Sequence, residues 1–217
     1  MTPRILAVCV GLPRAIGEDG APPVRSGIDK HPVSGPVAVG QMGLEGDGQA
    51  DLVNHGGVDK AVYAYDRSDA GYWEKHLGRA LPPGALGENL TVEGMASSVV
   101  RVGDRIRAGS VLLEVTQPRV PCYKLGVHMG DPAFPAAFAK ALRVGFYLRV
   151  IEPGSISAET AISSWEKATT SLSISDLMSL YLTGRHDTRQ LAAVAALPGL
   201  SAAWRKTLSE FLAAADR

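Results

Sequence analysis

The sequence has 217 residues, and its 22 Lys and Arg balance 22 Asp and Glu to give a formal net charge of zero. This length suits one sizeable domain with a small appendage, and the charge balance argues against a field that attracts nucleic-acid polymers or anionic membranes. Two distant cysteines make no disulfide framework, and no apolar run suits a signal peptide or a membrane span. We therefore expect a soluble, cytoplasmic protein that binds neither membrane nor nucleic acid.

Most of the chain predicts short strands punctuated by Gly and Pro, a pattern typical of a strongly bent sheet or barrel. Strands are expected at residues 4–10, 37–39, 61–65, within 86–95, and at 104–107, 111–115 and 145–151. The first strand contains Cys9, which we interpret as a core residue. The strands at 104–107 and 111–115 are expected to form a hairpin.

Helical periodicity appears in two places among the strands and again in the tail. Residues 66–77 predict a helix capped by Asp66, and a second helix is expected at about 134–142. The first helix carries an apolar stripe that we expect in the core: Tyr72, Trp73, His76 and Leu77. Beyond residue 166 the sequence predicts three short helices, the first capped by Ser173 and the third by Ser201. Helices this short need to pack on each other, and on the strands or a second subunit.

A Gly-rich stretch at residues 43–59 reads GLEGDGQADLVNHGGVD. Its spacing matches neither the dinucleotide-binding fingerprint nor a P-loop, but glycines permit close backbone approach to a ligand. Asn54, His55, Gly56 and Gly57 form a polar turn whose backbone amides can cradle an anion. The alternative is a plain connection between strands, with His55 as an ordinary turn histidine.

The segment around Cys122 reads VTQPRVPCYKL. Pro118 and Pro121 remove backbone donors and fix φ, so we expect a rigid irregular loop after the hairpin. Arg119 and Lys124 place positive charge beside the sulfur, and nearby cations favour the thiolate, the form that attacks or binds metal. Cys122 is therefore a candidate metal ligand or nucleophile, and the alternative is a small apolar residue facing the core.

Three stretches in order, GLEGDGQADLVNHGGVDKAVYAY, LGENLTVEG and TQPRVPCYKL, resemble the MOSC domain, and more narrowly its YiiM-type, 6-hydroxylaminopurine-resistance branch. The resemblance runs from about Val24 to Pro153, and the tail resembles the three-helix appendage of the family. It implies a mainly β fold, with a MOSC-type β-barrel domain at residues 1–165 and an all-α three-helix domain at residues 166–217.

The resemblance also implies a cofactor and a reaction. In the family, the cysteine that matches Cys122 ligates the molybdenum of a pterin cofactor, and members reduce N-hydroxylated compounds, including N-hydroxylated bases. By this resemblance Lys30, Lys60 and Arg119 are expected to hold the cofactor phosphate, and Glu88 and Asn89 the pterin edge. The expected cofactor contacts are Lys30, Asn54, His55, Gly56, Gly57, Lys60, Glu88, Asn89, Arg119 and Lys124. For Lys30 the alternative is a solvated charge, and for Asn89 a buried turn residue.

The expected partners follow from this chemistry. The substrate is a small N-hydroxylated molecule, and a separate flavin-type reductase is the electron donor, since the sequence shows no flavin, haem or iron–sulfur motif. A homodimer through the helical tail stays open. Two other functions also stay open. In the first, the protein is a non-catalytic carrier that holds molybdenum cofactor or persulfide sulfur at Cys122. In the second, Cys122 is the nucleophile of a hydrolase with His55 as base.

Overall fold

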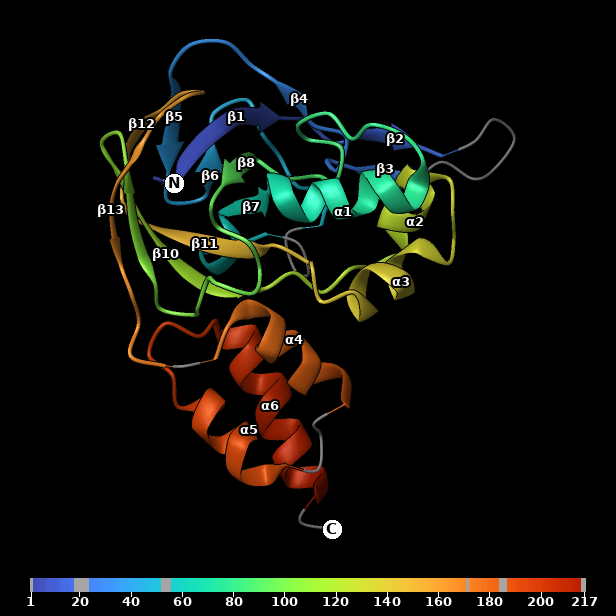
Figure 1. Cartoon of the computed structure of the whole chain (residues 1–217), viewed down its shortest axis with the longest axis vertical. Helices are drawn as coiled ribbons and strands as arrows, with labels where there is room; N and C mark the ends of the chain where they lie inside the picture. The colour runs from blue at the N-terminus through green and yellow to red at the C-terminus, as the bar shows by residue number, and fades with distance from the viewer. Residues whose placement is uncertain (1, 18–23, 52–55, 171, 184–186, 216–217) are drawn as a thin grey trace.

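The protein is mainly β, with helices at the ends of the strands and a helical C-terminus (Figure 1). The computed structural model describes residues 2–17, 24–51, 56–170, 172–183 and 187–215. The strands are β1 (Arg4–Val10), β2 (Arg14–Ile16), β3 (Val24–Ser26), β4 (His31–Pro32), β5 (Val37–Gly40), β6 (Gly43–Leu44), β7 (Val62–Asp66), β8 (Leu90–Glu93), β9 (Arg105–Ala108), β10 (Val111–Pro118), β11 (Phe146–Glu152), β12 (Gly154–Ile156) and β13 (Ile162–Glu166). The helices are η1 (Val58–Lys60), α1 (Arg67–Leu77), α2 (Tyr123–Met129), α3 (Phe134–Lys140), α4 (Ile174–Thr183), α5 (Thr188–Ala195) and α6 (Ala202–Ala215). Every strand expected from the sequence is confirmed, to within a few residues at its ends.

The central sheet has eight strands in the order β13-β9-β10-β11-β7-β8-β1-β4. All of its neighbours are antiparallel except β7 and β8, which are parallel. The predicted β9–β10 hairpin is confirmed, with Val111 opposite Ala108. Two smaller sheets, β12-β5-β6 and β2-β3, complete the strands.

The expected closed barrel is not found in the part of the chain that the structure describes. One edge of β1 pairs with β8, and the end of its other edge pairs with β4 through Cys9 and Pro32. Only the start of β1 reaches the region of β13, through an isolated bridge between Arg4 and Ala161 and through hydrogen bonds from the Ile5 N–H to the Thr160 carbonyl and from the Ile162 N–H to the Pro3 carbonyl. The sheet is strongly bent, but its ladder of paired strands ends at β13 and β4 and does not close into a barrel over the described residues.

Helix α1 begins as predicted, because the Asp66 side chain accepts a hydrogen bond from the Ser68 backbone N–H at 2.8 Å. Trp73 is buried, with ring centroids 4.9 Å from Phe134 and 5.5 Å from Phe138. The prediction that the whole stripe is core is wrong for two residues. Tyr72 is 42% exposed, and the exposed His76 stacks on it at the surface.

The irregular loop expected around Cys122 is shorter than predicted. Strand β10 continues to Pro118, and α2 starts at Tyr123, directly after Cys122. Cys122 adopts an extended backbone at the N-cap position without a capping side-chain hydrogen bond, and Gly130 ends the helix in a left-handed conformation. Rigid elements therefore flank the cysteine on both sides.

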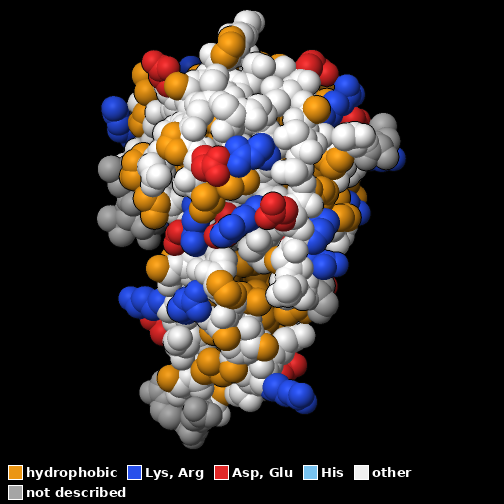
Figure 2. Space-filling model, turned by 90° about the vertical axis from the view of Figure 1, so that its left-hand side faces the viewer, with side chains coloured by type: hydrophobic (Ala, Val, Ile, Leu, Met, Phe, Trp, Pro, Cys, Tyr) orange, Lys and Arg blue, Asp and Glu red, His pale blue; other side chains and the backbone are white. Residues whose placement is uncertain are grey.

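The three predicted C-terminal helices are confirmed as α4, α5 and α6 and lie below the sheet in Figure 1. Ser173 and Asp176 cap α4 reciprocally, and the Ser201 hydroxyl accepts from the Trp204 N–H of α6 at 3.2 Å. None of the helices in the described ranges has the length and apolar content needed to cross a membrane. Acidic and basic side chains lie interspersed on the face shown in Figure 2, in keeping with the neutral net charge. The domain division at residue 165 stays a prediction.

Candidate functional site

One pocket brings together most of the residues singled out in the sequence. Its empty volume of about 660 Å³ falls in the range of small-molecule sites. The half-buried Cys122 contributes to its wall, together with residues from four loops and from β3, η1, β7, α2 and β11. The lining residues are Ser26, Gly27, Ile28, Lys30, Gly48, Gln49, Ala50, Asp51, Lys60, Tyr63, Gly87, Asn89, Arg119, Val120, Cys122, Lys124 and Tyr147.

Four cationic side chains line this pocket: Lys30, Lys60, Arg119 and Lys124. Among the described lining residues, Asp51 is the carboxylate that accompanies them. A cavity whose charged lining residues are mainly positive favours an anionic ligand or an anionic part of one. The phosphate-binding role expected for Lys30, Lys60 and Arg119 stays a prediction.

Lys30 is held by a carboxylate that the sequence analysis did not single out. Its ammonium forms an ion pair with Asp47, and both side chains are buried, at 7% and 2% exposure. The second Asp47 oxygen accepts from the Asn89 side-chain amide at 2.9 Å, and the first also accepts from the Gly11 N–H at 2.9 Å. Burial lowers the pKa of Lys30, and Asp47 opposes that shift. Lys30 is therefore a buried, partnered charge and not a solvated one.

Asn89 is fully engaged with the fold. Its side-chain oxygen accepts from the Tyr63 N–H at 3.1 Å, and its amide donates to Asp47 and to the Cys9 carbonyl. Asn89 therefore lines the pocket and also joins β1, β7 and the loop that carries Asp47. Cys9 is a core residue as predicted, with 0% exposure, and its burial raises the pKa of the thiol to about 12.

Arg119 lies buried behind Cys122. Its guanidinium donates to the Leu86 carbonyl at 2.6 Å and to the Tyr63 hydroxyl at 3.3 Å, and it sits 4.8 Å from the Tyr63 ring centroid. Burial opposes the charge, but polar neighbours that include the Cys122 sulfur raise the pKa of Arg119 overall. The same attraction stabilises the thiolate form of Cys122.

Lys60 is the last residue of η1. Its backbone N–H donates to the Gly57 carbonyl at 2.9 Å, which ties Lys60 to Gly57. Burial lowers the pKa of Lys60, while Asp51 and Asp59 act in the opposite direction. Gly57 has φ 93°, which favours glycine, and neither Gly56 nor Gly57 lines the pocket. Asn54 and His55 lie outside the described residues.

Glu88 lies beside the pocket but does not line it. Its carboxylate accepts from the Gly84 N–H at 2.8 Å, the Leu86 N–H at 3.0 Å and the Thr91 hydroxyl at 2.9 Å. Burial raises the pKa of Glu88, against these hydrogen bonds. The structure thus places Glu88 as the organiser of the turn that presents Gly87 to the pocket, away from the pterin contact expected for it.

Asp47, Tyr63 and Tyr147 belong to the site and were not singled out from the sequence. Asp47 carried a signal, because a charged residue in a Gly-rich loop next to a buried strand needs a partner. The two tyrosines lie on β7 and β11 with ring centroids 5.2 Å apart, a pairing that depends on strand register. Among the described residues, no group of three or more His, Cys, Asp and Glu is placed to hold a metal.

Comparisons with known proteins place this site in context. Residues 51–163 match the model of the MOSC domain, and residues 172–214 match that of the YiiM-like, 3-alpha helix domain. The chain is 34% identical over 216 residues to the uncharacterized protein YflK of Bacillus subtilis, covering 98% of this chain and 95% of that protein. A protein of Gibberella moniliformis named Reductase is 34% identical over 152 residues, which are 66% of this chain and 26% of the fungal protein. The crystal structure of YiiM from Geobacillus stearothermophilus superposes with a TM-score of 0.82 and 35% identity, covering 97% of this chain and 99% of that one.

Proposed function

This chain belongs to the MOSC domain family and carries a YiiM-like three-helix domain, and we propose that it is a molybdenum-cofactor-dependent reductase of N-hydroxylated compounds. The observation that carries the proposal is the meeting of the Cys122 sulfur and four cationic side chains in one pocket. The name Reductase of the fungal relative supports reductive chemistry for a chain of this kind. N-hydroxylated purine and pyrimidine analogues are the substrate class that we favour.

The residues present fit a molybdenum cofactor bound through a pterin. A thiolate is a soft ligand and suits a metal that the sulfurs of the pterin dithiolene already hold. Lysine and arginine suit the phosphate of such a cofactor, Lys as a point charge and Arg with a fixed fork of donors. Lys30, Lys60 and Arg119 would hold that phosphate, with Lys124 beside them in the same pocket, and Cys122 would ligate the metal.

The chain itself contributes binding, orientation and charge. When bound, the cofactor supplies the two-electron removal of oxygen from an N–O bond, so that R–NHOH with two electrons and two protons gives R–NH₂ and water. Arg119 places a positive charge near Cys122, which favours a negatively charged sulfur, and strand β10 and helix α2 flank the cysteine. A separate flavin-type reductase supplies the electrons.

The experiment is to measure molybdenum and pterin in protein made in a molybdenum-replete host, for the wild type, Cys122→Ser and Cys9→Ala. We expect stoichiometric molybdenum in the wild type and in Cys9→Ala, whose thiol is buried in the core. We expect Cys122→Ser to lose the metal or its normal absorption spectrum, and to lose turnover of 6-hydroxylaminopurine with a chemical reductant.

Two outcomes contradict the proposal. Bound cofactor without turnover of any N-hydroxylated base would indicate a carrier of cofactor or sulfur. If none of the three proteins contains molybdenum or pterin, the pocket does not bind this cofactor, and Cys122 is not its metal ligand.

A further inference from the structure

In the C-terminal helical segment (α4 to α6), helix α4 and the residues between α5 and α6 contact the part of the chain that carries the pocket. We propose that this helical segment positions two of the pocket cations, Lys60 and Arg119, and so sets the electrostatic field at Cys122. The inference depends on the geometry of the pocket and not on the identity of its ligand. It gives the helical segment a role in the site, whose lining residues all come from the first 147 residues.

The first contact is the joint that connects α5 to α6, residues 199–202. The Ser201 N–H donates to the Thr116 carbonyl of β10 at 3.2 Å, and the Ala202 N–H donates to the Asp59 carboxylate of η1 at 3.0 Å. Arg149 of β11 donates to the Gly199 carbonyl at 3.1 Å and pairs with Asp59 at 2.9 Å. The joint is therefore tied to three separate elements of the β part.

These ties end next to residues of the pocket wall. Asp59 immediately precedes Lys60, and the Asp59 carbonyl accepts from the Thr116 hydroxyl at 2.6 Å. The same hydroxyl lies 3.1 Å from the carbonyl of Tyr147, another lining residue. The Asp59 carboxylate lies at the N-terminus of the fourteen-residue helix α6, where the helix dipole stabilises its negative charge. The backbone that carries Lys60 is thus fixed partly by the helical segment.

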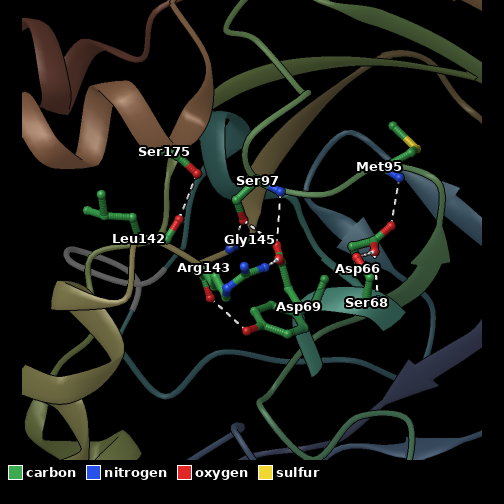
Figure 3. Close-up of polar contacts among 10 residues, drawn as sticks. Asp66, Ser68, Asp69, Met95, Ser97, Leu142, Arg143, Gly145 and Ser175 are labelled. Carbon is green, nitrogen blue, oxygen red and sulfur yellow. Dashed lines mark hydrogen bonds and ion pairs between the residues drawn. The ribbon is translucent and has the colours of Figure 1, made fainter. Parts of the chain in front are cut away.

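The second contact runs through the network in Figure 3. Ser175 of α4 donates from its hydroxyl to the Leu142 carbonyl at 2.8 Å and from its N–H to the Ser97 carbonyl at 2.9 Å. The Ser97 hydroxyl donates to Asp69 at 2.8 Å and accepts from the Gly145 N–H at 3.0 Å.

The chain around Gly145 in turn supports Arg119. The Gly145 carbonyl accepts from the Arg119 N–H at 3.3 Å, and the neighbouring Val144 carbonyl accepts from the Tyr63 hydroxyl at 2.8 Å. Tyr63 is the residue whose ring and hydroxyl contact the Arg119 guanidinium. In Figure 3 the ion pair between Arg143 and Asp69 closes the same network. Movement of α4 therefore reaches the backbone of Arg119 through three short hydrogen-bonded steps.

An uncharged methyl group added at residue 199, where there is no room for it, tests the inference. A Cβ at Gly199 would lie 2.6 Å from the Gly103 Cα and 2.8 Å from its N, so Gly199→Ala has to push the joint away from the sheet. Gly71→Ala is the matched control, because a Cβ at Gly71 meets nothing within 4 Å. Ala202→Pro is a second variant that removes the N–H donated to Asp59 at a helix position where proline is tolerated.

The readout is the rate of Cys122 alkylation in cofactor-free, full-length protein, measured with iodoacetate and with iodoacetamide. The two reagents have similar size, but iodoacetate is negatively charged and iodoacetamide is neutral. The rate constant for iodoacetate divided by that for iodoacetamide therefore rises with the positive field at the sulfur. Cys9 stays silent because it is buried, with its thiol pKa raised to about 12. We expect Gly199→Ala to lower the ratio about threefold, since displaced cations act over a longer distance. Gly71→Ala should keep the wild-type ratio, and Ala202→Pro should show a smaller fall.

A wild-type ratio in a folded Gly199→Ala protein, with shifted amide resonances at residues 199–202, would overturn the inference. If Gly199→Ala does not fold, Ala202→Pro decides, and an unchanged ratio there refutes it. Because the measurement needs no cofactor, failure of the molybdenum assignment leaves this test intact.

Discussion

The buried ion pair between Lys30 and Asp47 offers the sharpest test of how the pocket is built. Asp47→Asn keeps the shape of the side chain and removes its charge. The Lys30 ammonium then stays buried, at 7% exposure, without its carboxylate. The new amide has one acceptor oxygen in place of two. Its N–H₂ group therefore faces another donor, either the Asn89 amide, which donates to Asp47 at 2.9 Å, or the Gly11 N–H and the Lys30 ammonium.

The magnitude follows from the partners that remain. Breaking a buried pair on one side costs about 3–5 kcal/mol, and we expect the lower end of that range because Lys30 can release its proton. Burial already lowers the pKa of Lys30, so the neutral amine forms at modest cost. Lys30→Met should cost less, about 1–2 kcal/mol, because Asp47 keeps the donors from Gly11 and Asn89.

The assay is urea unfolding of both single variants and the double variant, followed by tryptophan fluorescence at about pH 7. The double variant should be less destabilised than the sum of the single changes by about 2 kcal/mol. An Asp47→Asn protein within about 1 kcal/mol of the wild type, or additive single effects, would show that the pair is not a coupled unit.

Two further predictions concern neighbouring groups. Glu88→Gln should lower the free energy of unfolding by about 1–3 kcal/mol, since the new amide leaves one of the Gly84 and Leu86 N–H groups without an acceptor. Urea unfolding checks this, and an unchanged midpoint would contradict the turn role of Glu88. Inorganic pyrophosphate should bind the cofactor-free pocket more weakly as pH rises, and the loss should begin below 10.5, because burial lowers the pKa of Lys30 and Lys60 and both lose their charge early. Calorimetric titration across pH checks this, and an affinity that holds constant up to 10.5 would contradict it.

The elements that the sequence predicted well are those whose signals are local. Alternation and flanking glycines located β1, β9 and β10, and the Asp66 side chain caps α1 as expected. Helix α2 was missed because its N-cap is Cys122, which makes no capping hydrogen bond, and because Pro118 and Pro121 precede it. The left-handed Gly130 at its end was the remaining local signal. The openness of the barrel was beyond prediction, since it depends on which strand takes the second edge of β1.

The site shows the same division between local and distant information. Cys122, Arg119 and Lys124 were predicted together because they are neighbours in the chain, and the pocket contains all three. Asp47 and Tyr147 were missed because their roles depend on partners far away in sequence. Glu88 was expected at the ligand because the family resemblance covers the Gly-Glu-Asn corner, but its carboxylate accepts hydrogen bonds from the Gly84 and Leu86 N–H groups of its own loop.

Three of the four cations of the pocket are held by different parts of the fold. Lys30 depends on Asp47, Arg119 on Tyr63 and the Leu86 carbonyl, and Lys60 on η1 with the helical segment behind it. Like charges gathered in one cavity repel each other, so they stay in place only where rigid partners fix them before the ligand arrives. An anionic ligand then binds without first having to order the side chains, which is the main cost of binding to a flexible cluster. On this argument a change at a residue that does not line the pocket, Asp47 or Gly199, should weaken anion binding as much as the loss of one pocket lysine.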